Sequence, residues 1–165
     1  MTLPRRVLVV QTAFLGDLVL TQPLVEELAR ALAPSPVDLL VKKPFADLAR
    51  SFRGVGEVIP FDKRGEERGL RGILRQRATL RVRGYDLAIA AQGSIRTGLV
   101  LASAGIARRI GFDDAAAAWL FHERVRNPQG PYPDGLHHLV VDGARVYLDG
   151  KKERHDHLLW WKAWR

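Results

Sequence analysis

One carboxylate stands out in the stretch VLVVQTAFLGDLVLTQP, residues 7 to 23. Asp17 follows a continuous apolar run and a short polar break and precedes a second apolar run, so it falls where a strand would feed a helix. Free amides and the helix dipole favour an ionised carboxylate at a helix start, and such a group could accept a proton from a bound hydroxyl. An acid at this position is most often only a helix cap, and the residues alone favour that alternative.

A second polar cluster, AQGSIRTG, follows another apolar run at residues 91 to 98. Gln92 and Gly93 would lie at the end of a strand, Ser94 is the expected N-cap of the next helix, and Arg96 falls in its first turn. The free amides of this helix start could hold an anion. On spacing alone, a capped helix with an exposed arginine is the favoured alternative.

No cofactor or metal motif accompanies these residues. The glycines match neither G-x-G-x-x-G nor G-x-x-x-x-G-K-[ST], which disfavours a dinucleotide or P-loop site. The chain has no cysteine, so it can form neither disulfides nor thiolate zinc sites. His137 and His138 are adjacent and would point apart on a helix, and His155 and His157 share a face only in an extended segment. We therefore predict no metal site and no cofactor.

The net charge of +8 and the pI of about 10.4 indicate an anionic partner. Eight basic residues and only two acids fall between positions 63 and 83. Leu70, Ile73, Leu74 and Ala78 recur there at helical spacing, which predicts an apolar face opposite an arginine-rich one. That second face could be solvated, bind nucleic acid, or dock a phosphorylated substrate, and an excess of arginine favours bidentate phosphate or carboxylate contacts. Nucleic acid is disfavoured because the segment has neither interleaved aromatics nor a recognition-helix motif.

The elements that must position these residues alternate between short β-rich runs and longer helical ones. This pattern predicts an α/β fold, a Rossmann-like open parallel sheet with helices on both faces. The expected strands are 5–11, 36–43, 56–62, 85–93 and 107–113. The expected helices are one with Pro23 near its first turn, 44–52, the basic segment, 94–105 and a closing helix within 136–148. Ligands of such sheets bind at the carboxyl ends of the strands, where Asp17 and Gln92 are expected.

A length of 165 residues fits one domain, which we assign to residues 1–148, followed by a divergent tail rich in tryptophan and lysine at 149–165. No apolar run approaches the ~18 residues that a membrane span requires. The absence of cysteine fits a reducing compartment. We therefore expect a cytoplasmic protein, with peripheral contact at the inner membrane as an option.

The motifs taken together resemble the amino-terminal half of the ADP-heptose:lipopolysaccharide heptosyltransferases, glycosyltransferase family 9. The resemblance covers about residues 5–138, through RRVLVVQTAFLGDLVLTQPLVEELARAL, EVIPFDKRG, YDLAIAAQGSIRTGLVLASAGIARRIGF and AWLFHERV. It implies the GT-B architecture, in which one Rossmann-like domain holds the acceptor and a second holds the ADP-sugar. It also implies an inverting, metal-independent transfer in which ADP-heptose enters as a substrate.

The resemblance assigns roles to individual residues as well. Asp17 falls on the aspartate of the F-L-G-D motif, the family's catalytic base, which would deprotonate the acceptor hydroxyl. Basic positions that engage acceptor phosphates or carboxylates fall on Lys63, Arg64, Arg96 and Arg124. The candidate substrate-binding residues are Gly16, Lys63, Arg64, Gln92, Gly93, Ser94, Arg96 and Arg124.

The family's nucleotide-sugar domain has no counterpart in this sequence, and the similarity ends near His138. The last six residues hold three tryptophans, which could form an interfacial membrane contact, belong to a helix over a sheet edge or docking face, or result from truncation or a frameshift. We favour the last because the composition changes where the similarity ends. The expected protein is an acceptor-binding domain that needs a C-terminal nucleotide-sugar domain as its partner and takes an anionic glycolipid or glycan. The alternative is a non-catalytic domain that binds anionic glycolipid or a membrane surface.

Overall fold

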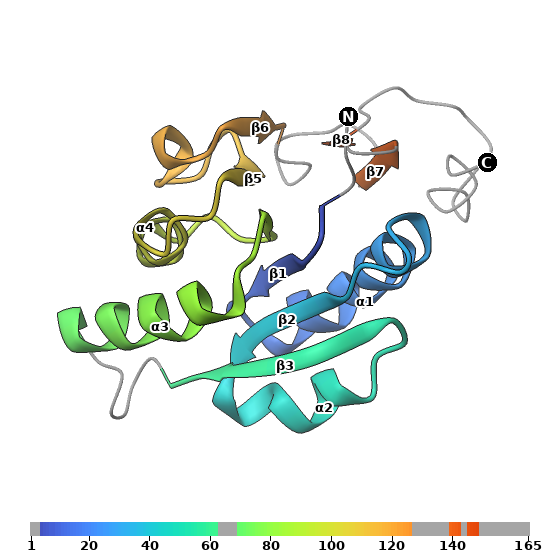
Figure 1. Cartoon of the computed structure of the whole chain (residues 1–165), viewed down its shortest axis with the longest axis horizontal. Coiled ribbons are helices and arrows are strands. Elements are labelled where there is room, and N and C mark those ends of the chain that lie inside the picture. The colour runs from blue at the N-terminus through green and yellow to red at the C-terminus, as the bar shows by residue number, and fades with distance from the viewer. Residues whose placement is uncertain (1–3, 63–68, 127–138, 143–144, 149–165) are drawn as a thin grey trace.

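The computed structural model describes residues 4–62, 69–126, 139–142 and 145–148 (Figure 1). Its centre is a six-stranded sheet of order β3-β2-β1-β4-β5-β6, in which every neighbouring pair is parallel. The strands are β1 (Val7–Gln11), β2 (Val37–Lys42), β3 (Val55–Phe61), β4 (Leu87–Ala90), β5 (Arg108–Phe112) and β6 (Glu123–Val125). The five predicted strands are confirmed, and β6 is an additional strand that the sequence analysis did not predict.

Helices cover both faces of the sheet, which confirms the predicted fold class (Figure 1). The helical elements are α1 (Leu15–Ala31), η1 (Lys43–Phe45), α2 (Ala46–Arg50), α3 (Gly69–Arg83), α4 (Ile95–Ser103) and η2 (Ala118–Leu120). Val7 and Val9 of β1 pack with α1 and α2, whereas Leu8 and Val10 pack with α3 and α4. Alternate residues of a strand point to opposite faces, so a central strand buried on both sides must be apolar throughout.

The first helix starts earlier than the sequence suggested. Pro23 lies inside α1 and not near its first turn, so that expectation is wrong. A proline at this point has no amide to donate to the carbonyl of Val19. Val19 is exposed, and water can reach that turn of the helix. The early start places Asp17 in the first turn of α1.

The predicted closing helix within residues 136–148 is also wrong. The structure has an antiparallel pair there, β7 (Leu139–Asp142) and β8 (Arg145–Leu148), with Leu139 opposite Leu148. The run is rich in β-branched and aromatic residues and is divided by a short connection containing a glycine, which is typical of a hairpin. The tail at 149–165 lies outside the described residues, so the domain boundary stays a prediction.

The basic segment forms α3 as predicted, but of the four residues expected on its apolar face only Ile73 packs against the core. Leu70 and Leu74 are exposed, and the residues buried against the sheet are Gly72, Gln76 and Leu80. Helical spacing alone cannot show which of two candidate faces packs inward. Here Leu80, which joins the core under α3 and α4, marks the inward side.

The buried carboxylate of Asp38 in β2 lies at the amino edge of the sheet, where the parallel strands begin. It accepts hydrogen bonds from Arg6 Nε at 2.7 Å, from the Glu57 amide at 2.8 Å and from the Tyr85 hydroxyl at 2.6 Å. Burial and the bond to Asp38 raise the pKa of Tyr85, which keeps the phenol protonated as a donor. Gly56 leaves the necessary room, since a Cβ there would lie 2.7 Å from Asp38 Oδ1. The amino ends of β1, β2, β3 and β4 are therefore joined through one side chain.

Replacing this carboxylate should be among the most costly single changes in the chain. Asp38→Ala leaves the donors of Arg6, Glu57 and Tyr85 without their acceptor, and should cost about 3 kcal/mol of unfolding free energy. Tyr85→Phe removes one of those donors and should cost about 1 kcal/mol. Urea denaturation of both variants measures the two values. Equal losses for both variants would contradict the central role of Asp38.

Glu57 links the same edge to α3 and should make the stability of the protein depend on pH. A hydrogen-bonded ion pair with Arg83, assisted by Arg6, lowers the pKa of Glu57 below its ordinary value of 4.5. A carboxyl with a lowered folded-state pKa stabilises the fold above its unfolded pKa, and the stabilisation is lost as the pH falls through the folded pKa. The unfolding free energy of the wild type should thus exceed that of Glu57→Gln by about 0.5–1 kcal/mol at neutral pH. Near pH 3 the two unfolding free energies should be equal.

Denaturant titrations at both pH values give this comparison. Asp47→Asn is the control, because Asp47 forms an ion pair with Arg50 and is fully solvent-accessible. A gap for Glu57→Gln that persisted at low pH would assign the effect to shape and not to charge.

Candidate active site

The carboxyl edge of the sheet brings together two of the segments that the sequence singled out. β1 ends at Gln11 and leads into α1, and its neighbour β4 ends at Ala90 and leads into α4. Asp17 lies in the first turn of α1, and Arg96 lies in the first turn of α4. Adjacent parallel strands thus deliver both helix starts to the same edge, as predicted.

Asp17 is half-buried and is held by its own helix start. Its Oδ2 accepts a hydrogen bond from the Phe14 amide at 3.0 Å, and its carbonyl oxygen accepts one from Thr21 Oγ1 at 2.7 Å. Phe14 is the N-cap residue, but its ring cannot accept a bond in return, so only half of a capping box is present. Asp17 therefore acts as a cap, as one interpretation of the sequence held.

Gln11 organises the loop before Asp17, and the sequence analysis did not select it. Its buried amide donates to the Ala91 carbonyl at 2.9 Å and to Thr21 Oγ1 at 3.3 Å, and it accepts from the Ala13 amide at 3.1 Å. One side chain thus connects the end of β1 to the end of β4, to α1 and to the loop. The available signal was a polar residue at the end of a strand that is otherwise apolar throughout.

Gln92 performs a similar task on the α4 side. Its amide donates to Thr12 Oγ1 at 2.5 Å and to Thr97 Oγ1. Ser94 occupies the N-cap position of α4 as predicted, although its hydroxyl makes no capping hydrogen bond. Gly93 is exposed at the entrance of this helix. The segment therefore holds its shape through Gln92 and presents backbone at the sheet edge.

Gly16 is exposed, and no atom would lie within 4 Å of a Cβ at that position. Its backbone has no positive φ, so the fold itself does not require glycine there. Its role as a substrate-binding residue therefore stays a prediction.

Two cations approach this edge from neighbouring elements. The Arg96 guanidinium lies over the ring of Phe61 at 5.0 Å, at the end of β3. Lys42, at the end of β2, has its Nζ 5.1 Å from the Phe14 ring and 5.9 Å from the Phe45 ring. Aromatic faces attract cations and restrict their position. Lys42 is a basic residue of this edge that the sequence analysis missed, because two flexible lysines after a strand carry no signal of their own.

The other predicted cations are placed differently. Arg124 lies on β6, which is separated from β1 by β4 and β5, and it is aligned with Gly111 in the middle of the strand pair. Lys63 and Arg64 lie outside the described residues, as do His137, His138, His155 and His157. Within the described residues, no group of three or more histidines or carboxylates could hold a metal ion.

Removing the Gln11 side chain should loosen the loop that carries Asp17. Gln11→Ala leaves the Ala91 carbonyl and the Ala13 amide without their partner, and should cost about 1–3 kcal/mol. Amide hydrogen exchange at Ala13 and Phe14 should become faster, whereas exchange in β2 should change only by the global loss. Gln22→Ala, on the half-buried side of α1, is the control. Unchanged protection at Ala13 would show that Gln11 does not hold the loop.

Known proteins with similar sequences point to one family. The model of glycosyltransferase family 9 (heptosyltransferase) matches residues 73–138. Lipopolysaccharide heptosyltransferase 1 of Pseudomonas aeruginosa is 33% identical over 129 residues, which is 74% of this chain and 34% of that protein. The chain thus spans about a third of the length of this relative.

Solved structures agree with the sequence relationship. Heptosyltransferase WaaC of E. coli, solved with ADP, superposes with a TM-score of 0.61 at 26% identity, covering 73% of this chain and 40% of that one. ADP-heptose lps heptosyltransferase II of E. coli superposes with a TM-score of 0.59 at 26% identity. The superposition covers 70% of this chain and 33% of that one. This partial coverage fits one half of a GT-B glycosyltransferase. Motifs, sheet order and relatives together identify the chain as a glycosyltransferase family 9, heptosyltransferase-like protein.

Proposed function

We propose that this chain is the acceptor-binding half of an inverting, metal-independent heptosyltransferase. It would hold an anionic lipopolysaccharide-core or related glycan acceptor, while ADP-heptose, as a substrate, is bound by a separate nucleotide-sugar domain. Asp17 would remove the proton from the acceptor hydroxyl as that oxygen attacks the anomeric carbon, and ADP would leave from the opposite face of the sugar. No bound cofactor enters this scheme.

The observation that carries the proposal is the geometry of Asp17. Among the residues that the structure describes, the hydrogen bond to its carboxylate falls on Oδ2, from the Phe14 amide. This bond fixes the carboxylate in one orientation at the carboxyl edge of the sheet. Oδ1 is then the atom that can accept a proton from a substrate hydroxyl. One carboxylate thus serves both purposes: Oδ2 caps the helix, and Oδ1 acts as the base.

The cations around this edge supply the second requirement, a place for acceptor anions. Arg96 and Lys42 are each positioned by an aromatic ring, which limits the entropy lost when they bind phosphate or carboxylate. Lys63 and Arg64 follow β3 directly in the sequence and would add to the same rim, and Arg124 would reach a more distant acceptor group. Gly16, Gly93 and Ser94 would line the approach, and Gln92 would keep the last two in place.

Two substitutions separate the roles of cap and base. Asp17→Asn keeps an oxygen that can accept from the Phe14 amide but cannot take a proton, so transfer should fall at least about 100-fold with little loss of stability. Asp17→Ala should lose the same activity and also about 0.5–1 kcal/mol of stability. Transfer is measured as ADP release from ADP-heptose with a heptose-free core acceptor. The chain is combined with the separately produced carboxyl-terminal half of a family relative.

Asp47→Asn, which changes an acid in the first turn of α2, is the matched control and should leave the rate unchanged. A full rate for Asp17→Asn would return Asp17 to the role of a cap alone.

A second candidate function is a non-catalytic domain that binds anionic glycolipid. It is favoured by the net charge of +8 and by the cations Arg96 and Lys42, each of which lies against an aromatic ring at the candidate site. Calorimetric binding of the acceptor to the chain alone, with no transfer in the combined assay, would support this candidate. A cytoplasmic site of action at the inner membrane is part of both proposals.

A further inference from the structure

The outward face of α3 carries a stripe of apolar side chains that the core does not use. Leu70, Leu74, Ala78 and Val82 recur at every fourth residue, so they form a slowly winding row along the helix. Leu70 is 78% exposed, Leu74 56% and Val82 88%. The row runs along the solvent side, since Gly72, Gln76 and Leu80 face the sheet.

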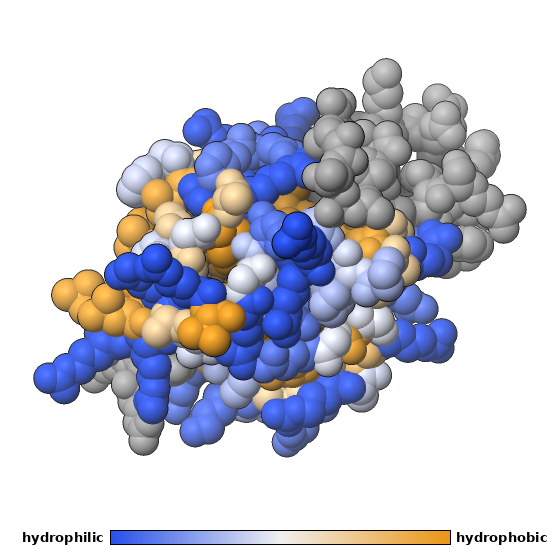
Figure 2. All heavy atoms as spheres, in the orientation of Figure 1, coloured by the Kyte–Doolittle hydropathy of each residue, from blue (hydrophilic) through white to orange (hydrophobic). Residues whose placement is uncertain are grey.

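Arginines border this stripe on both sides. At 100° per residue, Arg71 and Arg75 fall along one side of the row, and Arg77 and Arg81 fall along the other. Arg71, Arg75 and Arg81 are exposed, and Arg77 is half-buried. The range Gly69–Arg83 contains no acidic residue. Figure 2 shows hydrophobic side chains over α3, at the lower left, next to strongly hydrophilic ones.

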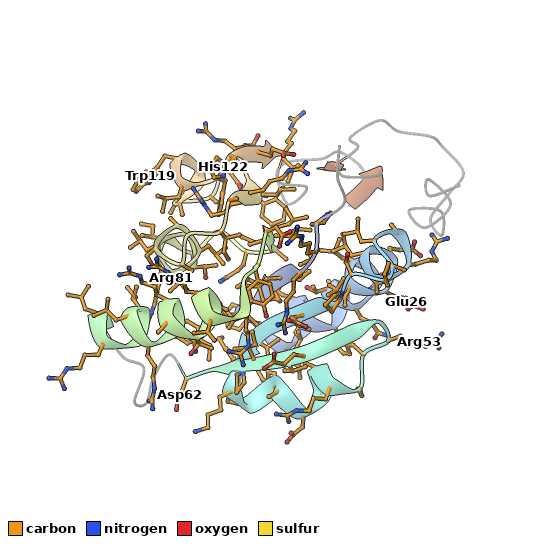
Figure 3. All side chains as sticks on the ribbon, in the orientation of Figure 1. Glu26, Arg53, Asp62, Arg81, Trp119 and His122 are labelled. Atoms are coloured by element: carbon orange, nitrogen blue, oxygen red, sulfur yellow. The ribbon has the colours of Figure 1, made fainter. Side chains whose placement is uncertain are left out.

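Two neighbouring elements extend the same surface. α4 packs beside α3 on the same face of the sheet and exposes Ile95 and Leu99, one helical turn apart. η2 packs against α4 and leaves Trp119 68% exposed. Trp119 and Arg81 lie on one side of the molecule in Figure 3. We call these residues of α3, α4 and η2 the basic apolar face.

A narrow apolar row between cations, with a tryptophan beside it, is the pattern of a helix that lies in a lipid headgroup layer. Leucine and valine enter the acyl boundary, the guanidinium groups contact lipid phosphates, and tryptophan favours the interface. A second copy of the chain would bring arginines against arginines, which disfavours self-association through this face. We propose that the basic apolar face docks on the surface of an anionic phospholipid bilayer.

This docking would orient the candidate active site. α3 follows the carboxyl end of β3, so the helix starts on the carboxyl side of the sheet, the side that also carries Asp17. A bilayer beneath α3 would then hold that edge close to the lipid surface, where a lipid-anchored acceptor is presented. Only this consequence rests on the proposed function, because docking itself needs neither a donor nor an acceptor. Within the described residues, no helix is long and apolar enough to cross a membrane.

The test is co-flotation of the full chain with vesicles of phosphatidylglycerol and phosphatidylcholine, compared with vesicles of phosphatidylcholine alone. Wild type should bind only the anionic vesicles, and rising salt should weaken binding. Leu70→Gln with Leu74→Gln should lower the partition coefficient at least about tenfold. Arg71→Gln with Arg75→Gln should lower it about 25-fold, which is about fivefold for each charge.

The matched control is Val19→Gln with Leu20→Gln, on α1 across the sheet. The side chains of Val19 and Leu20 are 47% and 78% exposed, and these fractions are similar to those of Leu74 and Leu70. This control should bind within about twofold of wild type, since α1 lies on the far face. Circular dichroism confirms that each variant keeps its helices.

Three results would overturn the proposal. One is wild-type binding by the Leu70 and Leu74 double variant. Another is equal loss in both apolar double variants. The third is a dimer in sedimentation velocity that the Leu70 and Leu74 changes abolish, without any vesicle binding by wild type; that result would assign the face to a second copy. The vesicles contain no heptose acceptor, so failure here leaves the transfer assay unaffected.

Discussion

The parallel pairing of β1 with both β2 and β4 is the constraint on which the rest of the structure depends. Parallel strands all point the same way, so each connection must return across a face and start its next strand at the same edge. The two edges of the sheet therefore differ in kind. One collects strand beginnings and the ends of helices, and the other collects strand ends and helix starts, whose free amides and loops are available to a ligand.

The two edges also use different polar chemistry to hold their elements. At the amino edge, Asp38 accepts hydrogen bonds from Arg6, the Glu57 amide and Tyr85, and Glu57 forms an ion pair with Arg83. The charges at this edge therefore stabilise the fold. At the carboxyl edge, the neutral amides of Gln11 and Gln92 connect the segments after β1 and β4, while an ion pair of Lys43 with Asp62 joins the segments after β2 and β3. A neutral amide satisfies backbone groups without pairing with a charge. The Asp17 carboxylate at the same edge accepts its hydrogen bond from the neutral amide of Phe14.

Those differences explain what the sequence could and could not predict. β1 and β4 were recognisable because a strand buried on both faces is apolar throughout, and the start of α4 followed from the N-cap signal of Ser94. The inward side of α3 was not, because both of its sides carry apolar residues, and only tertiary packing around Leu80 selects one of them. The roles of Gln11 and Lys42 depend on neighbours distant in the chain, Ala91 for Gln11 and Phe14 for Lys42. The hairpin of β7 and β8 was missed because a helical period was assumed over residues rich in β-branched side chains.

The selection of the α3 face has a consequence for how charge is distributed on the molecule. If Leu70 and Leu74 had packed inward, the arginines would have formed a plain solvated face around a hydrophilic helix. Because they point outward, apolar groups and cations share one surface, and neither alone accounts for it. Arginines would be sufficient for soluble anions, and leucines for an apolar partner. The combination is complementary to a boundary that is anionic at its surface and apolar just beneath it, and the helix that carries this surface starts on the same side of the sheet as the helix that carries Asp17.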